Sequence, residues 1–146
     1  MRTEIYEFGS ENYEELRDIW EKSVRATHDF LEEKDILDIK EKIFTYFSYV
    51  DIFGMKNEEG KITGFIGLSE DKIEMLFVVP EYFGKSIGKK LVSFAVKDMG
   101  IYLVDVNEQN PKAFEFYKKM GAVIVSRDET DSEGNPFPIL HLEFRA

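Results

Sequence analysis

Apolar residues recur along this chain with two different spacings, which predict an alternation of strands and helices. Residues 3–8 alternate apolar and polar side chains, as a half-buried strand does. Two segments follow in which apolar residues recur every three or four positions, so we expect amphipathic helices over 10–24 and 36–47. Ser10 is the expected N-cap of the first. The apolar faces consist of Tyr13, Leu16, Trp20 and Val24 in the first helix and of Ile36, Ile39, Ile43 and Phe47 in the second.

The middle of the chain predicts three strands within residues 49–80. Turn-forming residues at 57–60 and 69–71 separate them, and Pro80 ends the third because proline has no N–H for a sheet ladder. Behind a glycine-containing turn, residues 87–99 return to helical spacing. Gly100 is placed to close that helix.

The last third predicts one helix and three more strands. Residues 101–106 form a short apolar strand, and 111–121 form a helix that starts with a proline and ends at a glycine. Residues 122–129 and 137–144 are strands joined by a polar segment. The order is β-α-α-β-β-β-α-β-α-β-β, a mixed α/β fold with helices on both faces of a mixed sheet. Strand–helix–strand units around Gly84 and Asn110 imply parallel pairing at both places.

Length, composition and charge restrict the class of protein. A chain of 146 residues is expected to be one domain spanning 1–146, and 43% hydrophobic and 33% charged residues suit a soluble protein. The formal net charge of −10 argues against nucleic acid or an anionic membrane as partner. There is no cysteine, hence no disulfide and no thiolate. Without a signal-like start or a long apolar run, the expected location is the cytoplasm.

The turn between the third strand of the middle region and the next helix suggests phosphate binding. It reads EYFGKSIGKKL, and a glycine-rich turn from strand to helix is a common phosphate cradle. A Walker A loop does not fit, because only three residues separate Gly84 from Gly88 and Lys90 stands where serine or threonine is required. The dinucleotide spacing Gly-x-Gly-x-x-Gly is also absent. These mismatches disfavour a nucleotide-binding or phosphotransfer domain.

The chain resembles the GNAT superfamily of acetyl-CoA-dependent N-acetyltransferases. The family's phosphate loop reads Arg or Gln, two residues, Gly, one residue, then Gly or Ala, and it falls here on Phe83, Ser86 and Gly88. Gly88 matches outright, while Gly84 and Lys85 match common forms of the loop. Phe83 and Ser86 depart from the pattern.

The second half of the chain carries the stronger part of the resemblance. NEQNPKAFEFYKKMGA is similar to the family's fifth strand and fourth helix, with matches at Asn110, Ala113, Tyr117 and Gly121. SVRATHDFL, VNEQN and EGNPFPILHL resemble a bacterial YjaB-type group. The resemblance implies the GNAT fold, with a mostly antiparallel sheet of about seven strands and four helices.

The activity implied is direct transfer of an acetyl group from acetyl-CoA to a primary amine, on a small molecule or a protein lysine, without an acyl-enzyme. The implied partners are therefore acetyl-CoA and an amine acceptor, with the protein a monomer or a homodimer. A non-catalytic acyl-CoA sensor on the same fold is the alternative. Phe83, which departs from the family's loop pattern, is compatible with a sensor. A retained Tyr117 argues against a sensor, because a sensor needs no acid at the sulfur.

The resemblance also implies which residues bind acetyl-CoA. Backbone N–H groups of the loop would hold the pyrophosphate, and the loop residues are Phe83, Gly84, Lys85, Ser86, Ile87, Gly88 and Lys89. A serine at position 86 keeps its N–H but is unfavourable if the position needs positive φ. Lys85 and Lys89 add positive charge near the phosphates, or are ordinary surface lysines.

The pantetheine arm would bind along the strand before the loop. Its main-chain partners would be Leu76, Phe77, Val78 and Val79, with the N–H of Leu76 or Phe77 stabilising the oxyanion. On its other side the arm would contact Asn107, at the end of the following strand, and Asn110 and Ala113, at the start of the helix after it. Asn110 also fits a helix N-cap and Asn107 a turn.

Three residues are candidates for the chemistry. Tyr117 matches the family's acid at the leaving sulfur, although its place on an apolar stripe also suits core packing. Glu74 and His28 are candidate bases, and the alternative for each is that it is an ordinary exposed surface residue. Arg25 and Asp29, close to His28 in the sequence, are likewise either contacts to the acceptor or ordinary surface residues. His141 has no expected role. Histidine and carboxylate spacings predict no metal site.

Overall fold

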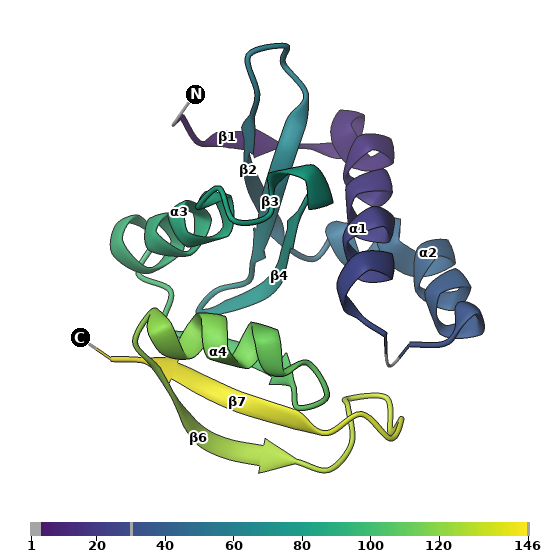
Figure 1. The fold of residues 1–146 in the computed structure, drawn as a ribbon, viewed down its shortest axis with the longest axis vertical. Helices are drawn as coiled ribbons and strands as arrows, with labels where there is room; N and C mark the ends of the chain where they lie inside the picture. The colour runs from purple at the N-terminus through teal and green to yellow at the C-terminus, as the bar shows by residue number, and fades with distance from the viewer. Residues whose placement is uncertain (1–3, 30, 146) are drawn as a thin grey trace.

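The computed structural model describes residues 4–29 and 31–145, which form one seven-stranded sheet flanked by four α-helices (Figure 1). The strands are β1 (Tyr6–Phe8), β2 (Asp51–Lys56), β3 (Ile62–Leu68), β4 (Lys72–Val78), β5 (Leu103–Asn107), β6 (Ala122–Asp128) and β7 (Ile139–Phe144). The helices are α1 (Tyr13–Thr27), α2 (Glu33–Phe47), α3 (Ile87–Ser93) and α4 (Pro111–Lys119), with 3₁₀ turns η1 (Ser10–Asn12) and η2 (Pro80–Tyr82) and a π-helical segment η3 (Phe94–Asp98). None of the helices in the described ranges is long and apolar enough to cross a membrane.

The predicted elements and their order are confirmed, with differences at some ends. The N-cap of α1 is Asn12 and not Ser10, because the 3₁₀ turn η1 precedes the helix. The Asn12 side chain accepts a hydrogen bond from the Gly9 N–H at 3.1 Å. Helix α2 starts before the predicted apolar face, at Glu33, since Asp35 accepts a hydrogen bond from the Glu32 N–H at 3.0 Å. The predicted first strand is shorter, and its residue 3 lies outside the described residues.

The strands are arranged in the order β1-β2-β3-β4-β5-β7-β6. Strands β4 and β5 are parallel neighbours, as predicted around Gly84, and the other neighbouring strands are antiparallel. The parallel pairing predicted around Asn110 is wrong, because β7 lies between β5 and β6 and pairs with both. The hairpin from β6 to β7 makes this possible, since a strand antiparallel to β6 can also pair antiparallel with β5.

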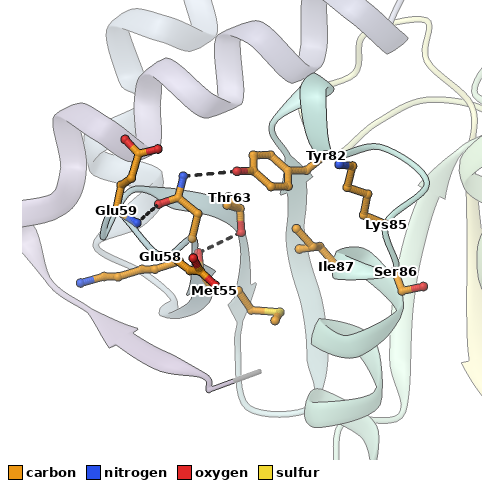
Figure 2. Close-up of a pocket in the computed structure, with 10 residues that line it drawn as sticks. Met55, Glu58, Glu59, Thr63, Tyr82, Lys85, Ser86 and Ile87 are labelled. Atoms are coloured by element: carbon orange, nitrogen blue, oxygen red, sulfur yellow. Dashed lines mark hydrogen bonds between the residues drawn. The ribbon is translucent and has the colours of Figure 1, made fainter. Parts of the chain in front are cut away.

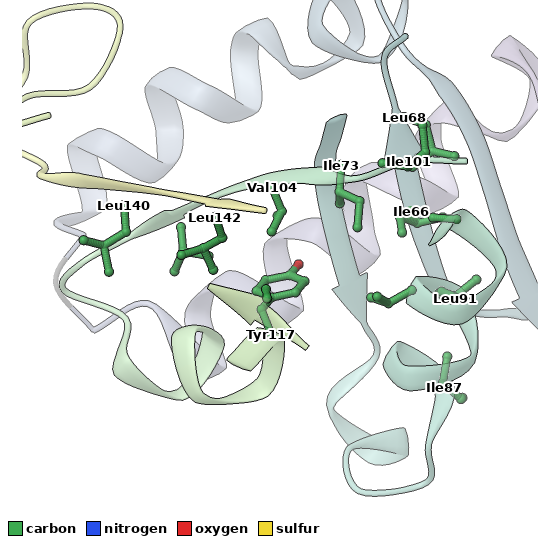
Figure 3. Close-up of a cluster of buried hydrophobic side chains, with 14 of the residues drawn as sticks. Ile66, Leu68, Ile73, Ile87, Leu91, Ile101, Val104, Tyr117, Leu140 and Leu142 are labelled. Carbon is green, nitrogen blue, oxygen red and sulfur yellow. The ribbon is translucent and has the colours of Figure 1, made fainter. Parts of the chain in front are cut away.

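Two hydrophobic clusters cover opposite faces of the sheet. One packs α3, η3 and α4 against β2 to β5 and β7, and includes Leu91, Val104 and Tyr117 (Figure 3). The other packs α1 and α2 against β1 to β3, around Leu16 and Phe47. Figure 1 shows the two helix pairs on the two sides of the sheet. Any site that reaches through the sheet is therefore flanked by different helices on its two sides.

Strands β4 and β5 pair over a short distance only. In the described chain the pairing consists of Lys72 with Leu103 and Ile73 with Val104, and the strands continue without further pairs to Val78 and Asn107. We call the space between them beyond Ile73 and Val104 the fork. The fork opens toward α4 on one face of the sheet and toward α1 on the other.

Candidate active site

Two connected cavities lie at the fork. The main cavity, of about 510 Å³, runs between the β4–α3 loop and α4. It is lined by Ser23, Thr27, His28, Leu76, Phe77, Val78, Tyr82, Phe83, Gly84, Ser86, Ile87, Gly88, Lys89, Asn110, Lys112, Ala113, Phe116 and Tyr117. The fork cavity, of about 190 Å³, lies between β4 and β5 and shares His28, Leu76, Phe77, Asn110, Ala113 and Tyr117 with the main cavity. The shared walls show that the two cavities adjoin.

The β4–α3 loop has the conformation that the sequence could only suggest. Ser86 has φ 67° and ψ 13°, the left-handed region, and Gly84 also has positive φ at 79°. The Ser86 carbonyl accepts the Lys90 N–H at 3.0 Å, so the turn leads directly into α3. A serine in this conformation carries a steric cost that glycine would avoid. The packing around the loop must therefore offset the steric cost of the left-handed backbone at Ser86.

Side chains of the loop point in different directions. Phe83 is 44% exposed and, like Lys89, lines the main cavity. Lys85 instead lines a separate cavity of about 580 Å³ beside the β2–β3 hairpin, with its ammonium 5.6 Å from the centre of the Tyr82 ring (Figure 2). In that hairpin cavity the Asn57 amide donates to the Tyr82 hydroxyl at 3.2 Å. The loop thus separates two cavities, and the Lys85 side chain lines the one away from the fork.

Tyr117 is packed in the core and also lines the candidate site. Its ring packs against Phe116 and Phe144, with centroids 5.1 and 6.2 Å away, and only 7% of the residue is exposed. The same residue lines both the main and the fork cavity. Figure 3 shows its hydroxyl pointing away from α4, toward the space between Val104 and Ile73. Burial raises the pKa of the Tyr117 phenol, which keeps the group protonated at any physiological pH.

The strand residues predicted to face the cofactor divide into two groups. Leu76, Phe77 and Val78 line the main cavity. Val79 does not line it: its N–H donates to the Thr63 carbonyl at 2.9 Å, and its own carbonyl accepts the Tyr82 N–H at 2.8 Å. Both main-chain groups of Val79 are therefore already bonded within the protein.

The two asparagines have structural partners as well as cavity positions. The Asn110 side chain accepts the Ala113 N–H at 3.2 Å, which is an N-cap of α4. The Asn107 side chain accepts the Gln109 N–H at 2.8 Å in the turn after β5. Asn110 lines both the main cavity and the fork cavity. Asn107 lines the fork cavity but not the main cavity. Structural and binding roles are thus compatible at both positions.

The two candidate bases, His28 and Glu74, both line the fork cavity. His28 follows α1, and its ring lies 6.5 Å from that of Phe77, with its Nδ1 2.7 Å from the Thr27 hydroxyl. Burial lowers the pKa of His28, so it is neutral at neutral pH and able to accept a proton. Glu74 is exposed, and its carboxylate accepts a hydrogen bond from Ser69 at 2.7 Å. Both residues line the fork cavity.

A third cavity, of about 480 Å³, adjoins the fork on the α2 side. It lies between α2 and the β6–β7 connection and shares His28 and Asn107 with the fork cavity. Its charged residues are Asp35, Asp38, Lys42, Asp131 and Glu133, four carboxylates against one ammonium, and we call it the acidic cavity. Within the described residues no group of three or more histidines and carboxylates is arranged to hold a metal ion.

Sequence reasoning missed several residues of the site. Ser23, Thr27 and Tyr82 line the main cavity and lie within the stretches SVRATHDFL and EYFGKSIGKKL, but they were not singled out as site residues, because only the fold shows that they face the cavity. Lys112 and Phe116 could have been found from their positions on the same helix as Tyr117. Arg25 lies away from the cavities, paired with Glu33 at 2.7 Å.

The chain belongs to the GNAT acetyltransferase family. Residues 49–121 match the family model of the acetyltransferase (GNAT) domain. The chain is 36% identical over 132 residues to the peptidyl-lysine N-acetyltransferase YjaB of Salmonella typhimurium, covering 90% of this chain and 91% of that protein. The enzyme class is therefore an acetyl-CoA-dependent acyltransferase.

Solved structures agree with this assignment. The solution structure of the apo form of YjaB from Escherichia coli matches with a TM-score of 0.88 and 34% identity, covering 97% of this chain and 96% of the other. The PaiA N-acetyltransferase of Thermoplasma acidophilum, solved in complex with coenzyme A, shares the fold with a TM-score of 0.72 at 24% identity, covering 97% and 98% of the two chains. The GNAT fold expected from the sequence is confirmed.

Proposed function

We propose that residues 1–146 act as one domain that transfers an acetyl group from acetyl-CoA to a lysine side chain of another protein, without an acyl-enzyme. The observation that carries the proposal is the position of Tyr117, where the main cavity meets the fork cavity. A phenol that burial keeps protonated is able to donate a hydrogen bond to a leaving thiolate and so stabilise its charge. The names of the relatives support a peptidyl lysine as acceptor.

The main cavity is the proposed binding site for acetyl-CoA. The pyrophosphate would lie against the loop of residues 83–89, where the chain turns from β4 into α3. The pantetheine arm would follow Leu76, Phe77 and Val78 toward the fork, with Asn110 and Ala113 on its other side. We leave Val79 out of this set, because its backbone groups are already bonded.

The fork cavity is the proposed place of the reaction. A neutral amine attacks the thioester carbonyl, and the oxyanion that forms needs a donor such as the backbone N–H of Leu76 or Phe77. The sulfur then leaves with its charge stabilised by the Tyr117 hydroxyl. A lysine amine has a pKa near ~10.4 in water, so it arrives protonated and must lose a proton before it attacks. His28 and Glu74 line the cavity where this proton is lost.

The acidic cavity is the proposed entry path of the acceptor. Its excess of carboxylates suits a cationic side chain, and His28 connects it to the fork. Asp35 and Asp131 bind backbone N–H groups of their own segments, and Glu133 contacts the Tyr46 hydroxyl at 3.5 Å. Asp38 has no hydrogen bond or ion pair with any other described residue, so its charge remains free for an acceptor.

Steady-state release of CoA thiol in the presence of lysine peptides tests the proposed enzyme against an acyl-CoA sensor. We expect peptide-dependent release with sequential kinetics, because the chain has no cysteine and the mechanism needs no acyl-enzyme. Binding of acetyl-CoA without release for any lysine peptide or small amine would favour the sensor. Ping-pong kinetics or a trapped acetyl-enzyme would contradict direct transfer.

A charge-neutralising variant tests the entry path. Asp38→Asn should raise KM for a peptide with arginines beside its lysine about fivefold, the equivalent of about 1 kcal/mol for one charge pair near water. Asp18→Asn on the exposed surface of α1 is the matched control, because it removes the same charge away from the cavities. Equal effects of the two variants would show that only net charge matters.

A further inference from the structure

A row of four charged side chains crosses the second half of the sheet. The Lys72 ammonium lies 2.9 Å from one oxygen of Asp105, and the other oxygen of Asp105 lies 2.7 Å from Nδ1 of His141. Nε2 of His141 lies 2.7 Å from the Asp128 carboxylate. These residues come from β4, β5, β7 and β6, so each link joins neighbouring strands. We call Lys72, Asp105, His141 and Asp128 the charged row.

The charged row reaches the fork cavity at Asp105 and ends in solvent at Asp128. Asp105 lines the fork cavity together with Tyr117, His28 and Glu74. Its neighbours Val104 and Val106 are buried in the cluster beneath α3 and α4, so Asp105 projects from the opposite face of β5. At the other end the side chain of Asp128 is 69% exposed. The row thus links the fork to the surface through the ring of His141.

The geometry at His141 implies that its resting form is the imidazolium. Carboxylates accept hydrogen bonds and do not donate them, so both 2.7 Å contacts require a proton on each ring nitrogen. Asp128 and Asp105 raise the pKa of His141 for the same reason. Lys72, on β4, lies beyond Asp105, and Glu143 is the next carboxylate on β7. A neutral His141 must give up one of the two contacts.

We propose that the charged row carries the proton of the acceptor ammonium from the fork to solvent, with His141 as the group that receives it through Asp105. This inference rests on the proposed acetyl transfer. The N–H bond of the ammonium breaks and leaves its electron pair on nitrogen for the attack on the thioester. Its proton passes to Asp105 and then to Nδ1 of neutral His141, while the proton on Nε2 passes to Asp128 and to water. One proton leaves the ammonium and one enters solvent, and the neutral His141 returns to its Nε2–H tautomer before the next turnover by exchanging protons with water, since its side chain is 28% exposed.

The route makes a specific demand on protonation. An imidazolium has no lone pair to accept a proton, so transfer requires His141 in its neutral form. At saturating substrates kcat should therefore rise with pH through the pKa of His141 and level off above it. His28 has its pKa displaced in the opposite direction, and proton removal by His28 would place the rise at lower pH.

Asp128→Asn is the test, because the side chain is exposed and lines none of the cavities described above. The variant removes one of the two carboxylates that favour the imidazolium, so the pKa of His141, measured by NMR titration, should fall. The rise in kcat with pH, measured with acetyl-CoA and an arginine-flanked lysine peptide, should move to lower pH by the same amount. Glu129→Gln, the same charge change one residue away, should leave both values unchanged.

The outcomes separate the proton route from the proposed function. Wild-type release of CoA thiol establishes the enzyme, whatever the variants do. If Asp128→Asn lowers the pKa of His141 but leaves the pH profile of kcat in place, the route is overturned and the acetyltransferase stands. As a second variant, His141→Gln should remove the rise from the profile and lower kcat by roughly 10²-fold. A His141→Gln enzyme with wild-type kcat and an unchanged profile would also overturn the route.

Discussion

Lys72 of β4 and Asp105 of β5 form an ion pair of 2.9 Å that crosses the sheet at the closed end of the fork. The two strands share only the pairs Lys72–Leu103 and Ile73–Val104, so this side-chain contact adds to a short backbone connection. Each side chain is about 30% exposed, at 29% and 32%. The pair therefore holds together the strands between which the reaction is proposed to occur.

Replacing Lys72 by methionine should affect activity more than stability. A partly exposed ion pair contributes about 0.5–1 kcal/mol, so we expect Tm to fall by about 2–4 °C. Because β4 and β5 would separate more easily, KM for acetyl-CoA should rise several-fold. Glu108→Gln breaks the exposed pair between Glu108 and Arg127 and is the control for stability. A Lys72→Met enzyme with unchanged KM would show that the backbone pairs alone set the fork.

Tyr117→Phe should lower kcat by roughly 10²-fold with little change in affinity for CoA. The variant removes the hydroxyl at the fork and keeps the ring that packs against Phe116 and Phe144. Steady-state kinetics and calorimetric titration with CoA measure the two effects separately. Loss of CoA binding in parallel with activity would instead make Tyr117 a packing residue.

Ser86→Gly should stabilise the protein. Position 86 has φ 67°, where a residue with a Cβ is strained by about 1–2 kcal/mol and glycine is not. Glycine loses more chain entropy on folding, so the expected net gain is about 0.5–1 kcal/mol, or an increase in Tm of about 2–4 °C. The loop N–H groups remain, and KM for acetyl-CoA should not rise.

The matched control for this glycine substitution is Ser93→Gly. Ser93 has ordinary helical angles, φ −59° and ψ −42°, so the same substitution there should destabilise the protein. If both variants lowered Tm, the backbone of residue 86 would not be strained in solution.

The two histidines should change stability with pH in opposite directions. Burial lowers the pKa of His28, so the unfolded chain binds its proton more readily, and stability falls as pH decreases from about 6.5 through the folded pKa. Asp128 and Asp105 raise the pKa of His141, so its contribution is complete below about 6.5 and is lost as pH rises through the folded pKa.

Chemical unfolding of His28→Gln and His141→Gln across this pH range measures both effects. The His28 variant should lose less stability than the wild type on acidification, and the His141 variant less on the alkaline side. The same slope in wild type and variant would remove that histidine from the pH dependence.

The amino-acid sequence by itself determined the elements and the family. Periodicity of two or of three to four residues is a local property, so it identified the helices and strands, including the face of α4 that carries Tyr117. Asn110, Ala113, Tyr117 and Gly121 stand close together in one helical segment, and that spacing survives in any fold. The loop of residues 83–89, the proposed acetyl-CoA loop, was recognisable for the same reason, although two of its positions depart from the pattern.

The tertiary structure decided how distant strands pair and which side chains they bring together. The insertion of β7 between β5 and β6 joins segments far apart in the chain, and no local pattern encodes it. That insertion places His141 between Asp105 and Asp128, 36 and 13 residues away. The left-handed backbone of Ser86 and the divergence of β4 from β5 likewise depend on packing around them. Periodicity reports which face of an element is buried, whereas a site assembled across strands depends on non-local contacts that form only on folding.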